Sequence, residues 1–306
     1  MIKRTLYFSN PYYLHCKQQQ LVAENPQEKN ARKMVPIEDI GIIVLEHPQV
    51  TLSHALLQQL MDYNVAVFSC TSKHMPLGLM LPMHAHHAAT EKMYAQLDAS
   101  QPLKKNMWQQ TITAKISNQA AMLKRSEIAT TNMEHWASAV KSGDPDNYEA
   151  RAAAYYWANL FTDIDDFKRH RFGAAPNNLL NYGYAILRGI IARSLVGSGL
   201  LVTMGIHHRN KYNPYCLADD IMEPYRPYVD LLVWEIMHVD ADIEEIKKEH
   251  KVKLLTLATM DIYIDGQYSP LMVAVQRTTA SVRKCFEGIS RKIIYPEMRF
   301  EDEHPF

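Results

Sequence analysis

The apolar pattern of the chain changes in character between residues 70 and 90, and this change restricts it to folds in which strands precede helices. Before the change, aromatic and β-branched residues gather in short runs typical of buried strands, such as Ile40–Glu46 (IGIIVLE) and Val65–Cys70 (VAVFSC). Between these runs, Ser53–Tyr63 has helical apolar spacing, and Ser53 is suited to cap its first turn. Arg4–Asn10 and Tyr12–Glu24 are further expected strand segments.

The segment between the two patterns is interrupted by Pro76, Gly78 and Pro82, so residues 75–89 are expected to form a linker. We therefore predict an α+β chain, with a small N-terminal β-sheet domain at residues 1–74 and a larger all-α C-terminal domain at residues 90–306. A short hairpin with Asp265-Gly266 at its turn is expected inside the helical domain at Ile262–Tyr268.

The helical domain is expected to contain several long helices. Their predicted ranges are Leu103–Leu123, a helix that begins near Glu149, Asn177–Gly199, Ile236–His250 and Thr278–Ile294. Small residues in the third of these, Gly189, Ala192 and Gly197, would let another backbone pack closely. Pro224 and Pro227 fit best in the first turn of a helix, where a missing N–H costs nothing, so Asp220 and Glu223 are expected at a helix entrance.

Charge is distributed unevenly although the formal net charge is zero. Residues 167–215 contain no acid, and residues 216–249 contain ten acids against three Arg or Lys. A local positive field can steer a polyanion even when the sum is zero. The alternative is that these cations only solvate helix faces. The basic residues of the acid-free stretch are Lys168, Arg169, Arg171, Arg188, Arg193, Arg209 and Lys211.

Composition excludes several other classes. The four cysteines lie far apart without a CxxC pair, which argues against a zinc ribbon or a disulfide scaffold and fits a reducing compartment. No apolar run reaches the length of a membrane helix, and the N-terminus lacks a long apolar core of a signal peptide. The chain is therefore expected to be a soluble cytoplasmic protein without a membrane partner.

Glu149, His208 and Glu223 are the candidate metal ligands. Two carboxylates and one imidazole make an oxygen-rich set suited to Mg²⁺ or Mn²⁺, ions that promote phosphodiester chemistry. Each residue also has a structural explanation, because a Glu at a helix start favours the helix dipole and a His after an apolar run is often a core or turn residue. The run His84, His86 and His87 is a second candidate, but without nearby Cys a polar linker explains it better.

Several long segments, in order, resemble the Cas1 family of CRISPR-associated endonuclease/integrases, and in particular its type II branch. The resemblance covers nearly the whole chain. It is carried by Val35–Cys70, Leu103–Leu123, Asp144–Trp157 (DPDNYEARAAAYYW), Asn177–Leu200, Gly205–Asp230 and the later VRKCFEGISRKIIYP.

The resemblance implies roles for individual residues. Glu149 takes the first ligand position of the family's Glu-Gly-x-Ala-Ala motif, with Ala150 in place of the glycine. The histidine of the family's Gly-x-x-His turn falls on His208, not on His207, and the final acid falls on Glu223. Asp220 matches a second family acid near the metal.

The resemblance also implies partners. Family members form homodimers through the β-domain, flank a dimer of the small Cas2 protein, and insert a short segment of double-stranded DNA into the repeats of the CRISPR array. Type II members also cooperate with an effector nuclease and an accessory protein.

Basic residues near the candidate ligands are expected to hold DNA phosphates; for Arg188, a structural ion pair is an equal alternative. The candidates are Arg209, Lys211, Arg226, Lys115 and Arg188. Two other functions remain as alternatives, a non-catalytic DNA-binding scaffold subunit and a standalone structure-specific DNA nuclease.

Overall fold

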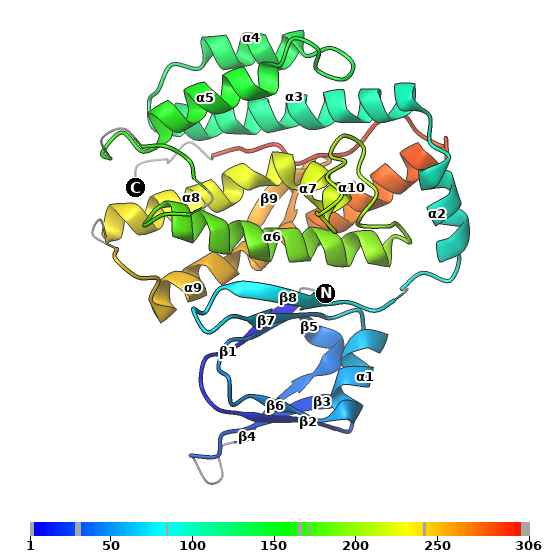
Figure 1. Ribbon diagram of the computed structural model, residues 1–306, viewed down its shortest axis with the longest axis vertical. Coiled ribbons are helices and arrows are strands. Elements are labelled where there is room, and N and C mark those ends of the chain that lie inside the picture. Colours follow the sequence, from blue (N-terminus) through cyan, green and yellow to red (C-terminus); the bar gives the residue numbers. More distant parts are fainter. Residues whose placement is uncertain are drawn as a thin grey trace.

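The computed structural model describes residues 3–27, 32–83, 85–164, 167–170, 172–240 and 243–300. Strands β1 to β8 gather at one end of the molecule, and most of the helices form layers above them (Figure 1). His84 and Arg171, which belong to the predicted histidine run and basic stretch, lie outside the described residues. Among the helices of the described residues, none is both long enough and apolar enough to cross a membrane.

The described residues of the N-terminal domain form two four-stranded sheets, one α-helix and the short 3-10 segment η1 (Ile37–Asp39). The first sheet has the order β1-β5-β7-β8 and the second has the order β4-β3-β2-β6. Helix α1 (His54–Asp62) is capped as predicted, since the Ser53 side chain accepts a hydrogen bond from the backbone of Leu56. The strands are β1 (Arg4–Phe8), β2 (Tyr13–Lys17), β3 (Gln20–Glu24), β4 (Arg32–Pro36), β5 (Ile40–Leu45), β6 (Thr51–Leu52), β7 (Ala66–Cys70) and β8 (Pro76–Met80).

Strands β5 and β7 are buried on both faces, which explains their nearly continuous apolar sequence. Alternate side chains on β5 belong to different cores. Ile43 faces the core of the N-terminal domain together with Leu56 of α1. Ile42 and Phe68 face the large core formed with the helices. The first sheet is therefore the shared wall between the two domains.

Strand β8 lies inside the range 75–89 that was expected to be a linker. It pairs antiparallel with β7 at the edge of the first sheet. Pro76 is compatible with this place, because proline is tolerated at the first residue of an edge strand. The chain then reaches helix α2 (Ala89–Leu97). The prolines and glycine that indicated a linker therefore mark an edge strand and its exit.

The helical domain follows the predicted pattern with two corrections at helix ends. The predicted helix Ile236–His250 is wrong, because α8 ends at Val239, Asp240 is extended, and α9 begins at Lys248. The predicted Thr278–Ile294 helix is displaced, since α10 starts directly after Pro270 and ends before Gly288, whose φ is +72°. The helices are α3 (Gln101–Arg125), α4 (Thr131–Ala139), α5 (Tyr148–Leu160), α6 (Asn177–Gly197), α7 (Cys216–Met222), α8 (Arg226–Val239), α9 (Lys248–Leu255) and α10 (Leu271–Phe286).

The predicted hairpin is confirmed as β9 (Asp261–Ile264) and β10 (Gln267–Pro270), with Asp265 and Gly266 at positive φ in its turn. Within the described residues of the larger domain, this pair of strands and an isolated bridge between Tyr263 and Glu297 are the only β-structure.

Helix α6 lies in the middle of the molecule (Figure 1), and two of its glycines make room for side chains of other elements. A Cβ at Gly189 would lie 2.0 Å from the ring of Phe68 on β7, and a Cβ at Gly183 would lie 2.4 Å from Val229 on α8. The close approach predicted at Gly189 is therefore made by an aromatic ring of the first sheet and not by a second backbone.

Candidate active site

Glu149 stands in the first turn of α5, and the loop before it fixes its backbone. Asp144 accepts hydrogen bonds from the N–H groups of Tyr148 (2.9 Å) and Glu149 (3.0 Å). These donors would otherwise be unpaired at the helix start. The Glu149 side chain is 28% exposed and turns toward α3. The sequence SGDPDN therefore supplies both the break before α5 and the carboxylate that positions its first turn.

His208 lies on the turn between α6 and α7, and this turn is wrapped around the buried carboxylate of Asp220. Asp220 accepts hydrogen bonds from the backbone N–H groups of Ile206 (2.7 Å), His207 (3.0 Å) and His208 (3.2 Å). It also lies 2.5 Å from His208 Nδ1, and this hydrogen bond raises the pKa of His208. Asp220 belongs to α7, not to a helix entrance as expected. Asp220 therefore orients the histidine through Nδ1, and the second ring nitrogen, Nε2, is not used in this bond.

The two neighbouring histidines have different environments. The ring of His207 stacks on the buried Trp108 of α3, with centroids 4.1 Å apart and planes 4° apart. Burial lowers the pKa of His207, so the ring is held neutral. Gly205 is required by the same turn, because a Cβ there would lie 2.7 Å from Asp220 Oδ2. His208 is thus the histidine with the hydrogen bond that a ligand histidine usually has.

Glu223 begins the short 3-10 segment η2 (Glu223–Tyr225) between α7 and α8. Pro224 lies in the first turn of η2 and Pro227 in the first turn of α8, as predicted. Asn118 of α3 donates a hydrogen bond to the carbonyl of Pro224 at 2.8 Å. Glu223 is 4% exposed, and Arg226 Nε donates to its Oε1 at 2.9 Å.

Lys115 of α3 joins the two carboxylates. Its Nζ lies 2.8 Å from Glu149 Oε1 and 2.6 Å from Glu223 Oε2. Burial alone would lower the pKa of Lys115, but the charges of Glu223 and Glu149 outweigh it and raise that pKa. Burial would likewise raise the pKa of Glu223, but Arg226 and Lys115 lower it to about 2. Both groups are therefore charged at neutral pH, and Lys115, which was predicted to contact a DNA phosphate, lies in a double ion pair with Glu149 and Glu223.

The arrangement has the donor atoms for a hard cation but not a finished cation site. Within the described residues, no three His, Cys, Asp or Glu side chains are grouped closely enough to hold an ion as they stand. Glu223 Oε2 is close to Lys115, yet it is buried and no described group donates a hydrogen bond to it with proper geometry. The charge on this oxygen is balanced by the Lys115 ammonium at 2.6 Å, so a cation could take the same place, and carboxylate oxygens with an imidazole suit Mg²⁺ or Mn²⁺. The donor set therefore fits, provided that the ammonium moves aside.

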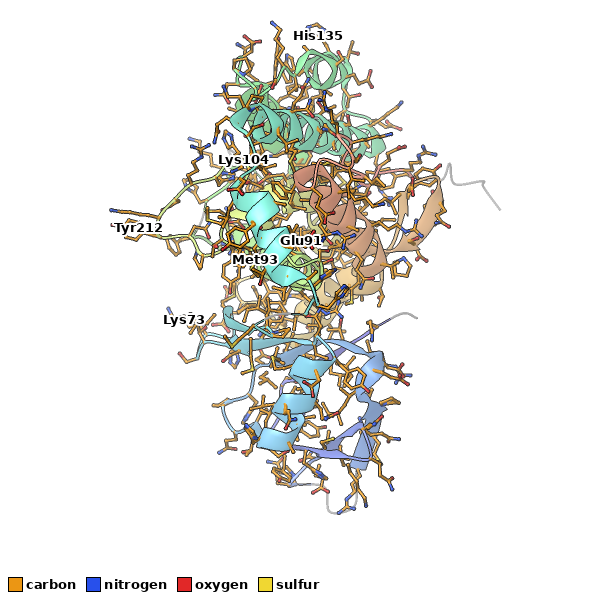
Figure 2. All side chains as sticks on the ribbon, turned by 90° about the vertical axis from the view of Figure 1, so that its right-hand side faces the viewer. Lys73, Glu91, Met93, Lys104, His135 and Tyr212 are labelled. Atoms are coloured by element: carbon orange, nitrogen blue, oxygen red, sulfur yellow. The ribbon has the colours of Figure 1, made fainter. Side chains whose placement is uncertain are left out.

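A cleft of about 1170 Å³ runs between the β7–β8 turn and the helical domain, and its described lining includes basic and aromatic residues but no Asp or Glu. Figure 2 shows Lys73 and Tyr212 projecting from the same side of the molecule. A smaller cavity of about 140 Å³ shares Arg169, Tyr184 and Arg226 with this cleft and reaches Lys115 and Glu223. The basic cleft thus leads directly to one of the two carboxylates.

The expected DNA-binding residues fall into different surroundings. Arg226 and Arg188 both line the cleft, but Arg188 also pairs with Asp219 at 2.6 Å, so both of its expected roles have structural support. Arg209 is exposed and donates to Gln101 at the start of α3. Lys211 is exposed, and its Nζ lies 4.9 Å from the centre of the Tyr212 ring.

Sequence reasoning missed the polar cluster behind the cavity. Asp230 of α8 is buried and accepts hydrogen bonds from Tyr156 and Tyr184. Burial raises the pKa of Asp230 to about 7. The sequence signal for this cluster was an acid within the apolar run of α8. In the same way, the signal that Lys115 is buried was its place as the one charged residue between Lys105 and Lys124.

The histidine run does not form a second metal site in the described part of the chain. His86 Nδ1 accepts a hydrogen bond from the backbone of Ala88 at 3.1 Å, and its Nε2 faces Arg283 at 3.2 Å. Both ring nitrogens are therefore engaged by the protein itself.

Comparison with known proteins gives one consistent result. The family model for CRISPR associated protein Cas1 matches residues 6–260. The chain is 34% identical to the "CRISPR-associated endonuclease Cas1" of Neisseria meningitidis serogroup C (strain 8013), over 92% of this chain and 91% of that protein.

Solved structures agree with the fold. A casposase bound to its integration product aligns with a TM-score of 0.81 at 19% identity, over 100% of this chain and 96% of that chain. A Cas6-RT-Cas1–Cas2 complex aligns with a TM-score of 0.74 at 17% identity, over 97% of this chain and 36% of that chain. The match over most of its length shows that the chain belongs to the Cas1 family of CRISPR-associated proteins.

Proposed function

We propose that this chain is the DNA-joining enzyme of CRISPR adaptation, an endonuclease/integrase that inserts short foreign DNA segments into the CRISPR array. Family membership supports this function, as does the similar Neisseria protein, which is named an endonuclease. The casposase of the same fold was solved with an integration product, which gives further support.

One observation carries the proposal. Glu149 and Glu223 come from different helices, and both contact Lys115, while His208 is held by Asp220 close enough for both carboxylates to affect its charge. Such a concentration of oriented, partly buried ionisable groups beside a basic cleft is typical of a site built for chemistry on a polyanion.

Glu149, His208 and Glu223 would hold Mg²⁺ or Mn²⁺ in this proposal. When bound, the ion would supply polarisation of the phosphodiester and neutralisation of its charge. His208 would contribute Nε2, because Asp220 occupies Nδ1. Lys115 would balance the carboxylates in the absence of the ion, since a site with two unpaired buried acids would be destabilised by their repulsion.

In the proposed reaction, residues of the cleft hold the DNA while its strands are joined. A DNA 3′-hydroxyl attacks a phosphorus of the target strand, so that one phosphodiester bond forms and one breaks, releasing a new 3′-hydroxyl; no protein nucleophile is required. Arg226 and Arg169 line both the cleft and the small cavity and would hold the phosphates. Attack by water in place of the 3′-hydroxyl would give the nuclease activity.

The partners of this reaction follow from the family. We include in the proposal double-stranded DNA, a Cas2 dimer and a second copy of this chain docked through the N-terminal domain. The fold shared with the Cas1 part of a Cas6-RT-Cas1–Cas2 complex supports the Cas2 partner. Membership in the type II branch, cooperation with an effector nuclease and accessory protein, and residence in the cytoplasm remain predictions.

The test separates chemistry from binding. Glu149→Ala and Glu223→Ala each remove negative charge beside a polyanion, so duplex DNA binding should persist or tighten while strand transfer with Mn²⁺ is lost. Lys124→Ala, at an exposed position in the last turn of α3, is the control and should keep activity. Loss of DNA affinity in step with activity, in folded variants, would overturn the assignment. Activity that survives in both variants would favour the non-catalytic scaffold as the role of this chain.

A further inference from the structure

Helix α2 has an unusual means of attachment to the protein. Gln96 is the one residue of α2 that is fully buried, with 1% of its surface exposed. Tyr94 and Leu97 beside it are 63% and 43% exposed. Helices normally dock through an apolar stripe. Here the buried side chain is a primary amide, a group that is costly to bury unless both of its ends are paired.

Both ends of the Gln96 amide bind the loop that leads to the histidine turn. Nε2 donates to the carbonyls of Leu201 (2.9 Å) and Met204 (2.8 Å), and Oε1 accepts from the N–H of Leu201 (2.8 Å). These backbone groups lie outside any helix or strand. The Gln96 side chain therefore supplies the hydrogen-bond donor and acceptor that a neighbouring strand would supply in a sheet. Met204 stands four residues before His208.

The same loop is tied to the acid that orients His208. The N–H of Leu217, in the first turn of α7, donates to the carbonyl of Val202 at 2.8 Å. Helix α7 carries Asp220, which holds the turn by three backbone bonds and the His208 ring. A shift of the loop would therefore move both the histidine and its partner.

The corner between α2 and α3 holds the turn on its other side as well. Arg209, directly after His208, donates to Gln101 Oε1 at 2.6 Å. Trp108, two turns further along α3, stacks on His207. Other contacts fasten α2 itself to α10, in particular Lys92 to Glu287 at 2.5 Å. The amide of Gln96 is thus not needed merely to attach the helix, and all three of its bonds go to the loop before the turn.

We propose that Gln96 is a positioning residue for His208, which sets the place of the histidine turn through the backbone of Leu201 and Met204. This inference rests on the proposed function in one respect, since the consequence for metal binding and strand transfer requires His208 to be a ligand. Figure 2 shows α2, marked by Glu91 and Met93, on the face of the molecule toward the viewer, where its outer side is open to solvent.

The test compares Gln96→Leu with Gln110→Leu. Gln110 of α3 makes the same kind of contact, donating to the carbonyl of Arg291 (2.8 Å) and accepting from the N–H of Ile293 (2.8 Å), but in a segment that carries no site residue. Both variants should lower the melting temperature. Only Gln96→Leu should weaken Mn²⁺ binding, measured by calorimetry, and slow strand transfer, each by about 10- to 100-fold, as is usual when a group that orients a metal ligand is lost. Equal effects of the two variants would overturn the proposal.

A second readout does not depend on metal or DNA. The proton between His208 Nδ1 and Asp220 should give a low-field NMR signal that shifts or broadens in Gln96→Leu and stays in place in Gln110→Leu. If the unmodified protein neither binds Mn²⁺ nor joins DNA, the proposed function fails while this signal still decides the positioning role. Should Gln96→Leu fail to fold, Gln96→Glu is used, because it keeps the acceptor for Leu201 and turns an oxygen toward the two carbonyls; an unchanged signal in folded Gln96→Glu would overturn the proposal.

Discussion

Asp220 holds His208 through two separate bonds, one to the ring and one to the backbone. The carboxylate lies 2.5 Å from Nδ1 and also accepts from the N–H of His208 at 3.2 Å. Because Asp220 is completely buried, water does not compete for these bonds. Ring orientation and tautomer are therefore fixed by the protein itself, which is the condition that suits His208 to the proposed role of a metal ligand.

Replacing the two histidines separately should give opposite results. His208→Ala should lower strand transfer by at least about 100-fold, since losing even an outer partner of a ligand costs about 10- to 100-fold. His207→Ala removes the stack on Trp108 and should cost about 1 kcal/mol of stability while keeping most of the activity. Strand-transfer rates and thermal unfolding of both variants decide this. Greater loss of activity in His207→Ala would show that the turn had been assigned one residue out of place.

Removing the ammonium between the carboxylates should make the protein depend on divalent cations for stability. Lys115→Met leaves Glu149 and Glu223 facing each other, and breaking a buried ion pair typically costs about 3 kcal/mol or more. Mn²⁺ should restore much of this loss, so the rise in melting temperature on adding Mn²⁺ should be larger than in the unmodified protein. Lys124→Met, at an exposed lysine in the last turn of the same helix, serves as the control. The same small response to Mn²⁺ in all three proteins would contradict a cation site between these acids.

The order of strands and helices was accessible from sequence because periodicity is a local property. The continuous apolar run of β5 and the helical spacing of α3 depend only on which faces each element buries. The ends of α8 and α10 were not accessible, since they depend on the extended Asp240 and the positive φ of Gly288. Family resemblance indicated Glu149, His208 and Glu223, but the role of Lys115 requires knowing that α3 passes between α5 and η2. Long-range pairing of this kind has no local signal.

Asp230 should make stability depend on pH in a direction opposite to that of a surface carboxylate. Its pKa is raised from 3.8 to about 7 by burial, so the folded protein binds this proton more tightly than the unfolded chain. The associated stability is fully present below pH 4 and is lost as the pH rises toward and through 7. Asp230→Asn stays neutral throughout. Its free energy of unfolding, relative to that of the unmodified protein, should therefore rise by more than about 1 kcal/mol between pH 5 and pH 8, since one unit of pKa shift is worth about 1.4 kcal/mol.

Denaturant unfolding of both proteins at the two pH values measures this difference, with Glu235→Gln on the same helix as a part-exposed control. If the difference in free energy of unfolding between Asp230→Asn and the unmodified protein is the same at both pH values, the carboxyl of Asp230 is ionised throughout. The Tyr156 and Tyr184 hydroxyls would then stabilise its charge despite its burial.

Salt dependence should show whether the acid-free stretch contacts DNA. Each phosphate contact adds about 0.9 to the slope of log affinity against log salt for duplex DNA. Replacing Arg209 and Lys211 together by Gln should lower this slope by up to about 2 and weaken binding to all sequences alike. Lys17 and Lys33, exposed on the second sheet at the far end of the N-terminal domain, give a matched double variant whose slope should not change (Figure 1). An unchanged slope in the Arg209/Lys211 variant would mean that DNA is held elsewhere, with Lys104 and Lys105 at the start of α3 as the next residues to replace. Since Arg209 also donates a hydrogen bond to Gln101, the melting temperature of the Arg209/Lys211 variant must be measured in parallel.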